Sequence, residues 1–506
     1  MTNARRRNDP LEEQNPISDE ADTSPAAYTP HRTGPLQGLT DPSLAVTSAT
    51  PRGFRTLMRN RLFLRLWLAQ LISQTIMNAA NYALIIVTQK TGSGGFTAAA
   101  GAIVAFSLPA LLFGAPAGVL VDRFDRRLVL WVSNFLRAIA CIIFAIVLMV
   151  DSTPLLPVYI LAFFIAMVGQ FFAPAEGAAI PLLVRRDELI HALSLFNITF
   201  TLAQATGLII LGPLMLALIP TFRIGTAAHG LDFTSRQTLF IVIAVLYMVC
   251  VGLILSIPKA RMRVNRQARD SSDVLFASSD MSQVRRVYVS ILQTGNFIRK
   301  DRRLVISVAQ LALGGSLVAV IAMIAPGFVQ QFFHKPAELA ALVFVPAGAG
   351  LILGSAITPN VARRLGYART IAYGVIMVAV SAALLIGTWA AARQIFGVQA
   401  FVGQPVYFVL MLMWTFAIGI GLDFINVPAQ TMLQEHSPDW IKGRVLAVQA
   451  MILNGATIPF VLIMGRVADG FGLPLAVLVL AGIIASVGLL SVYIGSRSDS
   501  AQSASS

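Results

Sequence analysis

Charged residues are scarce in this sequence. Asp, Glu, Lys and Arg account for 12% of the 506 residues, whereas 56% are hydrophobic. The mean hydropathy is +0.73, which is far above the value that a hydrophobic core inside a polar surface would give. Composition therefore excludes a water-soluble globular protein and indicates an integral membrane protein.

The residues of metal and nucleotide chemistry are also few. The two cysteines, Cys141 and Cys250, lie inside apolar runs and are interpreted as packing residues. Five histidines are scattered over tail and loop regions, so neither a metal site nor a catalytic triad is predicted. No Gly-x4-Gly-Lys-Ser/Thr loop occurs, which argues against ATP as the energy source. We therefore expect a protein that is not an enzyme and has no cofactor.

Basic residues outnumber acidic ones, which gives a formal net charge of +14 and a pI near 10.4. They gather in short loops between apolar runs, where membrane orientation and anionic lipid account for them. We therefore predict the lipid bilayer, and no nucleic acid, as a partner. Because basic loops mark the cytoplasmic face, both termini are expected in the cytoplasm. The loops on that face are 52–65, 123–127, 185–186, 259–303, 363–369 and 442–444.

Twelve apolar runs are long enough to cross a bilayer core of about 30 Å as helices. Ala69-Gln70-Leu71 recurs as Ala309-Gln310-Leu311 at the equivalent place in the second half, which indicates a duplicated chain. The runs begin near positions 63, 98, 128, 155, 192, 237, 304, 337, 370, 403, 444 and 473. The predicted parts are a disordered cytoplasmic tail (1–53), a six-helix bundle (54–258), a cytoplasmic linker (259–303), a second six-helix bundle (304–496) and a disordered tail (497–506).

The linker contains a short apolar stripe with helical spacing. Val284, Val287, Tyr288, Ile291 and Leu292 recur as one face of a helix. This pattern predicts an amphipathic helix on the inner leaflet, and the alternative is a helix packed on a cytoplasmic partner.

A charged cluster separates the second and third runs. Five of the six residues from Asp122 to Arg127 are charged. Asp122 can accept hydrogen bonds from a helix N-terminus, and Arg126 and Arg127 can hold neighbouring helix ends or lipid phosphate. Such contacts can latch two halves of a transporter in one conformation, and the alternative is that the arginines only fix membrane topology.

Gly118-x-Leu120-x-Asp122-Arg123-x-x-Arg126-Arg127 resembles motif A, the loop 2–3 signature of the Major Facilitator Superfamily. The wider sequence is similar to the bacterial twelve-span drug:proton antiporters of the macrolide-efflux and enterobactin-export type. The resemblance implies an all-α membrane protein with 12 transmembrane helices in two pseudo-symmetric six-helix bundles, acting as a monomer. It also implies that Asp122 meets the start of span 11 near Gly443 and Arg444. The acidic residue that this branch often carries in span 1 is absent.

Polar residues inside the spans are the candidate cavity residues, because such residues are costly in lipid. They recur at helical spacing in spans 1, 5 and 10, and in the superfamily fold spans 1, 4, 7 and 10 line the central cavity. The alternative for each is an interhelical hydrogen bond. The residues are Gln70, Gln74, Asn78, Asn81, Asn197, Thr201, Gln204, Gln310 and Asn426.

Three charged residues lie deep inside predicted spans. Asp423 lies near the midplane, where burial favours its neutral form, and we predict that it binds the coupling proton or a cationic substrate. A structural hydrogen bond and a buried ion pair are the alternatives for Asp423. Arg137 and Glu176 lie at equal depth in adjacent antiparallel spans, which predicts a salt bridge, with a coupling role as the alternative.

Gly207-x4-Gly212-Pro213 partly resembles the antiporter motif of drug exporters, in which glycine and proline permit a helix kink. The sequence therefore favours a secondary transporter that exports a small amphipathic organic molecule in exchange for protons. The alternatives are an exporter of an endogenous metabolite, such as a siderophore or lysolipid, and a transport-inactive scaffold or receptor with the same fold.

Overall fold

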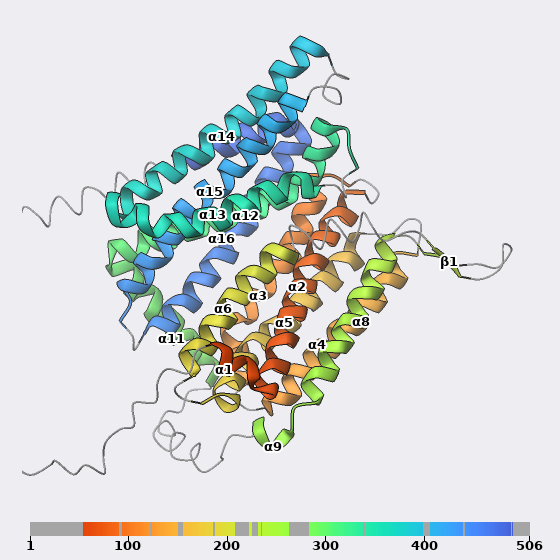
Figure 1. Ribbon diagram of the computed structural model, residues 1–506, viewed down its shortest axis with the longest axis vertical. Coiled ribbons are helices and arrows are strands. Elements are labelled where there is room, and N and C mark those ends of the chain that lie inside the picture. Colours follow the sequence, from red (N-terminus) through yellow and green to blue (C-terminus); the bar gives the residue numbers. More distant parts are fainter. Residues whose placement is uncertain are drawn as a thin grey trace, which may run out of the picture. The chain divides into compact units, whose positions relative to one another are not determined.

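The computed structural model describes residues 54–90, 94–121, 124–149, 155–185, 188–207, 222–224, 231–233, 235–262, 283–336, 340–397, 405–438, 441–486 and 488. The described residues belong to one compact unit. Both predicted tails, 1–53 and 497–506, lie outside the described residues. Nearly all described residues are helical (Figure 1), and the exception is a short antiparallel pair of strands, β1 (Phe222–Ile224) and β2 (Leu231–Phe233).

The first half contains α1 (Phe54–Arg59), α2 (Arg61–Lys90), α3 (Phe96–Val121), α4 (Arg126–Val147), α5 (Leu155–Leu183), α6 (Leu189–Ala205), α8 (Ser235–Leu255) and α9 (Lys259–Met262). The linker contains α11 (Gln283–Lys300). The second half contains α12 (Arg302–Phe333), α13 (Ala341–Leu365), α14 (Tyr367–Phe396), α15 (Pro405–Glu435), α16 (Lys442–Phe471) and a shorter helix over Leu473–Ser486.

Ten of the described helices are long and apolar enough to cross a membrane. Many of their large apolar side chains are exposed, among them Ile160, Ile352 and Ile463, as expected for a surface that faces lipid. The prediction of an all-α membrane protein is therefore confirmed. The fifth and twelfth predicted spans correspond to α6 and to Leu473–Ser486, which are shorter and run into residues outside the description.

Spans 1 and 7 each begin at a polar side chain that lies just before the apolar run. The side chain of Asn60 accepts hydrogen bonds from the backbone N–H groups of Leu62 and Phe63 at the start of α2. Asp301 accepts one from Arg303 N at 2.8 Å at the start of α12. Both side chains satisfy N–H groups that have no partner inside the helix. Spans 1 and 7, which carry the Ala-Gln-Leu repeat, thus also share the way in which they start.

Close helix packing in the second half depends on small residues. A Cβ atom on Gly374 of α14 would lie 2.7 Å from the carbonyl oxygen of Gly421 on α15. A Cβ atom on Gly421 would in turn lie 3.0 Å from Gly374 O. Because dispersion and hydrogen bonding drive helix association inside lipid, glycine lets these two backbones approach closely enough to associate.

The linker helix α11 packs on one end of the second half. Ile291 and Ile298 contact a cluster that contains Leu304, Leu433 and Val445. Leu292 is 68% exposed on another side of the same helix. The helix expected from the sequence is present. Part of its apolar stripe packs on the second half, and the part that carries Leu292 is exposed.

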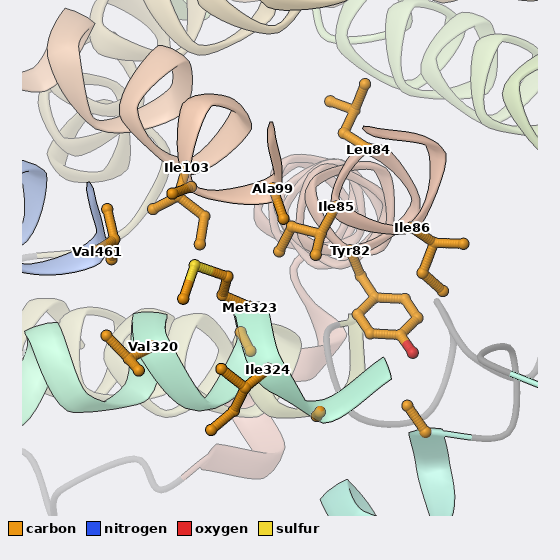
Figure 2. Close-up of a cluster of buried hydrophobic side chains, with 14 of the residues drawn as sticks. Tyr82, Leu84, Ile85, Ile86, Ala99, Ile103, Val320, Met323, Ile324 and Val461 are labelled. Carbon is orange, nitrogen blue, oxygen red and sulfur yellow. The ribbon is translucent and has the colours of Figure 1, made fainter. Parts of the chain in front are cut away.

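The two halves share one hydrophobic core cluster. Helix α3 packs extensively on α16, and α12 contacts both α2 and α3. Figure 2 shows side chains of this cluster from all four helices, including Ile85 of α2, Ile103 of α3, Met323 of α12 and Val461 of α16. The core of the molecule therefore joins segments from both halves of the duplicated chain.

Candidate functional site

A carboxylate of the second half caps the N-terminus of a helix of the first half. Asp469, near the end of α16, accepts hydrogen bonds from the backbone N–H groups of Phe96 and Thr97, each at 2.8 Å. These groups begin α3, and a helix N-terminus has unpaired N–H groups and a partial positive charge. Asp469, a residue of the second half, thus supplies hydrogen-bond acceptors for the unpaired N–H groups of α3 and a negative charge opposite their partial positive charge.

The surroundings of this contact are tightly packed. A Cβ atom on Gly95 would lie 2.7 Å from Asp469 Oδ1, and one on Gly465 would lie 3.0 Å from Phe96 O. The Phe96 ring lies against Gly327 of α12, where a Cβ atom would overlap it. At Gly465 the absence of a side chain lets α16 approach the backbone of α3, whereas at Gly95 and Gly327 it leaves room for the Asp469 and Phe96 side chains.

Helices α3 and α16 run antiparallel, with a constant register. Gly465 lies against Ala100, and the position of a Cβ atom on Gly455 lies 3.6 Å from Leu111 Cδ1. Continuing that register brings Gly443, at the start of α16, opposite the end of α3 near Val121. The end of α3 and the start of α16 are thus the two helix ends between which the resemblance expects the Asp122 contact.

The motif A end of this helix pair differs from the Phe96 end. Gly118 and Gly443 have no described heavy atom within 4 Å of the position that a Cβ atom would take. Arg444 is exposed. Asp122 and Arg123 lie outside the described residues, so their predicted contact with α16 is not seen. In the described part, the two helices therefore meet closely at the Phe96 end, whereas no described atom contacts the Cβ position of Gly443 at the start of α16.

The remaining motif A residues hold helix ends within the first half. Arg127 Nη2 donates to Leu255 O at 2.5 Å, and Arg65 Nη1 donates to Ser256 O at 2.6 Å, both at the C-terminal end of α8. Asp125 caps α4 by accepting from Arg127 N at 3.0 Å, and Lys259 Nζ lies 3.8 Å from its carboxylate. Arg126 begins α4. Cationic groups at a helix C-terminus stabilise it, so this loop ties three spans together.

Arg137 lies in the middle of α4 and is 2% exposed. Its Nη1 donates to the hydroxyl of Ser73 on α2 at 3.1 Å, and that hydroxyl donates to Asn134 Oδ1 at 3.0 Å. The guanidinium carbon lies 5.2 Å from the centre of the Phe172 ring and 5.8 Å from that of Tyr247. Neutral hydroxyl, amide and aromatic groups therefore surround this buried cation.

Glu176 of α5 is 5% exposed, and its Oε1 is buried without a hydrogen-bond partner. Arg137 interacts with it electrostatically, yet the two described side chains do not form an ion pair in this structure. The direct salt bridge predicted from equal depth is thus not formed in this structure, in which the hydrogen bond of the arginine goes to the Ser73 hydroxyl.

Asp423 of α15 is 8% exposed and faces α13. Its Oδ2 accepts a hydrogen bond of 2.5 Å from the Ser355 hydroxyl, and a Cβ atom on Gly354 would lie 2.9 Å from Asp423 Cβ. Its described hydrogen-bond partner is therefore neutral, which matches the structural alternative among those open at the sequence level.

The candidate cavity residues do not form one cluster in the described part of the chain. Gln70 and Gln74 are buried, and each has a side-chain oxygen without a hydrogen-bond partner, as does Asn81. Asn78 instead donates to Gln74 O at 2.8 Å within α2. Buried amide oxygens without partners are rare in proteins, so span 1 contains unused acceptors for a ligand or water.

The other predicted polar residues are distributed differently. Asn426 of α15 packs on Gly314 of α12, and Gln310 is buried one turn before that glycine. Gly207 packs against Thr75 and Asn78 of α2. The side chains of Asn197, Thr201 and Gln204, together with Gly212 and Pro213, lie outside the description.

A separate hollow of about 380 Å³ lies at the motif A end of α15. Val427, Gln430, Thr431, Gln434, Glu435 and Lys442 line it. It borders the start of α16 and lies away from Gln70 and Gln74, so it differs from the predicted midplane cavity. Within the described chain, no three His, Cys, Asp or Glu side chains gather as ligands of one metal ion would.

Four contact residues were missed from the sequence: Ser73, Asn134, Ser355 and Asp469. A signal for Asp469 exists, because Gly465-x-Val467-x-Asp469-x-Phe471 repeats the spacing of Gly118-x-Leu120-x-Asp122-x-Phe124. One signature lies at the end of α16 and the other at the end of α3. For Ser73 and Asn134 the sequence offers one signal, which is that each is a polar residue within one helical turn of other polar residues.

The comparisons with known proteins agree with this architecture. A family model described as Major Facilitator Superfamily matches residues 66–402. An uncharacterized MFS-type transporter of Bacillus subtilis (strain 168), YfiS, is 22% identical over 393 residues, which are 77% of this chain and 82% of the relative. Macrolide efflux protein A of Streptococcus pyogenes is 31% identical over 150 residues, which are 29% of this chain and 36% of that protein.

Solved transporter structures share the fold at low identity. The nucleoside transporter NupG has a TM-score of 0.61 at 13% identity, over 85% of this chain and 98% of its own. A POT family transporter in complex with 5-aminolevulinic acid has a TM-score of 0.61 at 12% identity, over 86% of this chain and 96% of its own. With its helical spans, its motif A loop and the family match over most of its length, this chain belongs to the Major Facilitator Superfamily.

Proposed function

We propose that the chain is a proton-coupled exporter of amphipathic organic molecules, located as a monomer in a bacterial cell membrane and working by alternating access. Membership of the superfamily establishes the coarser statement that it is a multi-pass membrane transport protein. The observation that carries the proposal is the difference between the two ends of the α3–α16 pair: one end is hydrogen-bonded through Asp469, and at the other no described atom contacts the Cβ position of Gly443.

Each helix of this pair carries an aspartate close to its C-terminal end and offers an N-terminus to the other helix. Asp469 caps α3 in this structure. In the proposed cycle Asp122 caps α16 when the opposite end closes, as the motif A resemblance implies. Rigid halves that rock about a midplane site exchange one contact for the other, because closing one end opens the other. The proposal places the motif A end in the cytoplasm, on the strength of the basic loops, and accordingly treats this structure as an inward-open state.

Export of a drug-like molecule is supported by the partial likeness to macrolide efflux protein A. Amphipathic substrates are held by apolar contacts and a few polar groups, and Gln70, Gln74 and Asn81 supply unused amide oxygens on one helix. Proton coupling requires a titratable group inside the spans. Asp423, predicted from the sequence, and Glu176 are the described carboxyl groups that fit this need.

Inside-out vesicles with an acidic interior test the proposal. Macrolides, cationic dyes and catechol siderophores are added in turn while the pH gradient is followed by acridine fluorescence. Substrate-dependent dequenching in vesicles that contain the protein, but not in empty vesicles, supports proton-coupled export and identifies the substrate class. No response from inserted protein to any compound contradicts a drug:proton antiporter, whereas a response to the siderophores alone favours metabolite export.

A further inference from the structure

We propose that Glu176 carries the coupled proton and that Arg137 is its counter-charge, bound to Ser73 when Glu176 is protonated and to Glu176 when it is ionised. This inference rests on the proposed function, since it assigns the proton that the exporter exchanges. It selects Glu176 over Asp423, and it replaces the fixed salt bridge expected from the sequence with two alternative partners for one arginine.

The geometry places Arg137 along the face of α5 that carries Glu176. Gly169, Phe172 and Glu176 are spaced three and four residues apart and so share one side of that helix. A Cβ atom on Gly169 would lie 2.9 Å from Arg137 Nη2, and the guanidinium lies over the Phe172 ring. Glycine at position 169 leaves room for the guanidinium, and Glu176 follows within two turns. A change of arginine rotamer along this face brings the two groups together.

In this structure both Glu176 and Arg137 have a buried polar atom without a hydrogen-bond partner. These atoms are Glu176 Oε1 and Arg137 Nε. Unsatisfied buried groups cost free energy, and an ionised carboxylate costs more than a neutral carboxyl. The observed arrangement therefore suits a protonated Glu176. After ionisation the carboxylate becomes the strongest acceptor near Arg137, so the arginine leaves the Ser73 hydroxyl for it.

The other groups around the pair cannot replace either partner. Ser73 of α2 and Asn134 of α4 are neutral. Tyr247 and Cys250 of α8 and Cys141 of α4 lie within electrostatic reach of Arg137. These groups are neutral when protonated, so in the described part of this site Arg137 is the one cation and Glu176 the one carboxyl group. Asp423, by contrast, is bonded to the neutral Ser355 hydroxyl on α13.

The proposed exchange is balanced. An O–H bond forms on Glu176 when a proton enters from the acidic side, and Arg137 then returns to Ser73. The same O–H bond breaks when the site faces the other side, and the proton leaves to water while Arg137 binds the carboxylate. Because Ser73 lies on α2 and Glu176 on α5, each proton step changes which pair of helices the arginine connects. Proton binding thereby favours one arrangement of the first half.

Purified protein in proteoliposomes tests this inference by drug-driven proton movement and by drug exchange without a gradient. Glu176→Gln is expected to abolish drug-driven proton movement while drug exchange persists and loses its pH dependence. Glu188→Gln is the matched control, because Glu188 is also 5% exposed but lies at the N-terminal end of α6, away from Arg137, and it should keep proton movement. A folded Glu176→Gln variant that still moves protons with the drug overturns the inference.

Ser73→Ala provides a second test that removes neither charge. Without the hydroxyl, Arg137 binds the Glu176 carboxylate more readily, so protonation needs more acid and the pH midpoint of transport should shift down by about one unit, a tenfold change in proton affinity. An unchanged midpoint overturns the exchange of partners. If Asp423→Asn abolishes proton movement and Glu176→Gln does not, this inference fails and the proposed function stands. If wild-type protein moves no protons with any drug, both fail.

Discussion

Asp469 binds the backbone of Phe96, a residue 373 positions earlier, and so links the end of α16 to the start of α3. The second carboxylate oxygen binds the neighbouring N–H group of Thr97. One side chain of the second half therefore satisfies two groups at the N-terminus of a helix in the first half. This contact is the counterpart, at the other end of the same helix pair, of the one that motif A is expected to make.

Asp469→Asn should destabilise the state that is closed at the Phe96 end. The change removes the negative charge and one of two acceptors, which costs about 1–2 kcal/mol and increases the open fraction about tenfold. Met323→Cys is the reporter, because Met323 is fully buried in the cluster that joins the halves. A water-soluble maleimide should label it about tenfold faster in the Asp469→Asn background.

Two glycines near Asp469 extend that experiment, one as a second perturbation of the contact and the other as a control. Gly95→Ala places a methyl group against the carboxylate and should accelerate Met323→Cys labelling in the same direction as Asp469→Asn. Gly470→Ala has open space around its Cβ position and should leave labelling unchanged. Equal labelling rates in all three backgrounds would show that the Asp469 contact does not hold this end closed.

Asp423 and Ser355 should be coupled energetically, since their side chains are hydrogen-bonded between α15 and α13. In a double-mutant cycle with Asp423→Asn and Ser355→Ala, we expect an interaction energy of about 0.6–1.7 kcal/mol in the unfolding free energy. Reversible unfolding in mixed micelles measures it. Additive losses would contradict a structural bond between these helices.

Gly354→Val should lower stability more than the same change at a glycine without close neighbours. A branched side chain at position 354 would overlap Asp423 and force α13 away from α15, at a cost of about 1–3 kcal/mol. Gly387→Val on α14 is the control, because its Cβ position is open. Thermal unfolding of the two variants makes the comparison, and similar losses would count against close packing at position 354.

Arg127→Ala should weaken the C-terminal end of α8 modestly. The guanidinium donates to the last turn of that helix and also interacts with its dipole, which together contribute about 0.5–1 kcal/mol at low salt. Arg65→Ala should have a similar effect, and high salt should reduce both. Arg261→Ala, on the exposed side of α9, serves as the control. Salt-independent melting differences would exclude an electrostatic role for this part of motif A.

The sequence predicted the spans and the loop chemistry because these depend on local properties. A run of about 20 apolar residues is recognisable wherever it packs, and Asp301 before a helix start acts as a cap in any surroundings. The family resemblance through motif A was likewise carried by one continuous stretch. These features required no knowledge of which helices are neighbours.

The partners of the buried polar residues could not be predicted in the same way. Equal depth indicated a salt bridge between Arg137 and Glu176, but the rotamer that selects Ser73 depends on α2, which contributes its residues from elsewhere in the chain. Asp469 was overlooked because its role appears only when α16 lies against α3. Depth follows from sequence, whereas the choice among several partners at one depth follows from packing.

The most direct test of alternating access measures both ends of the molecule in one protein. Nitroxide pairs at Phe124→Cys with Leu365→Cys, and at Met149→Cys with Phe471→Cys, use exposed side chains near the motif A end and the Phe96 end. The native thiols of Cys141 and Cys250 are buried and should not react. Upon a shift from acidic to alkaline pH with a macrolide present, pulsed electron paramagnetic resonance should show the first distance shortening while the second lengthens, because release of the coupled proton and binding of the drug favour closure of the motif A end. Distances that stay constant, or that change in the same direction, would contradict rocking of the two halves.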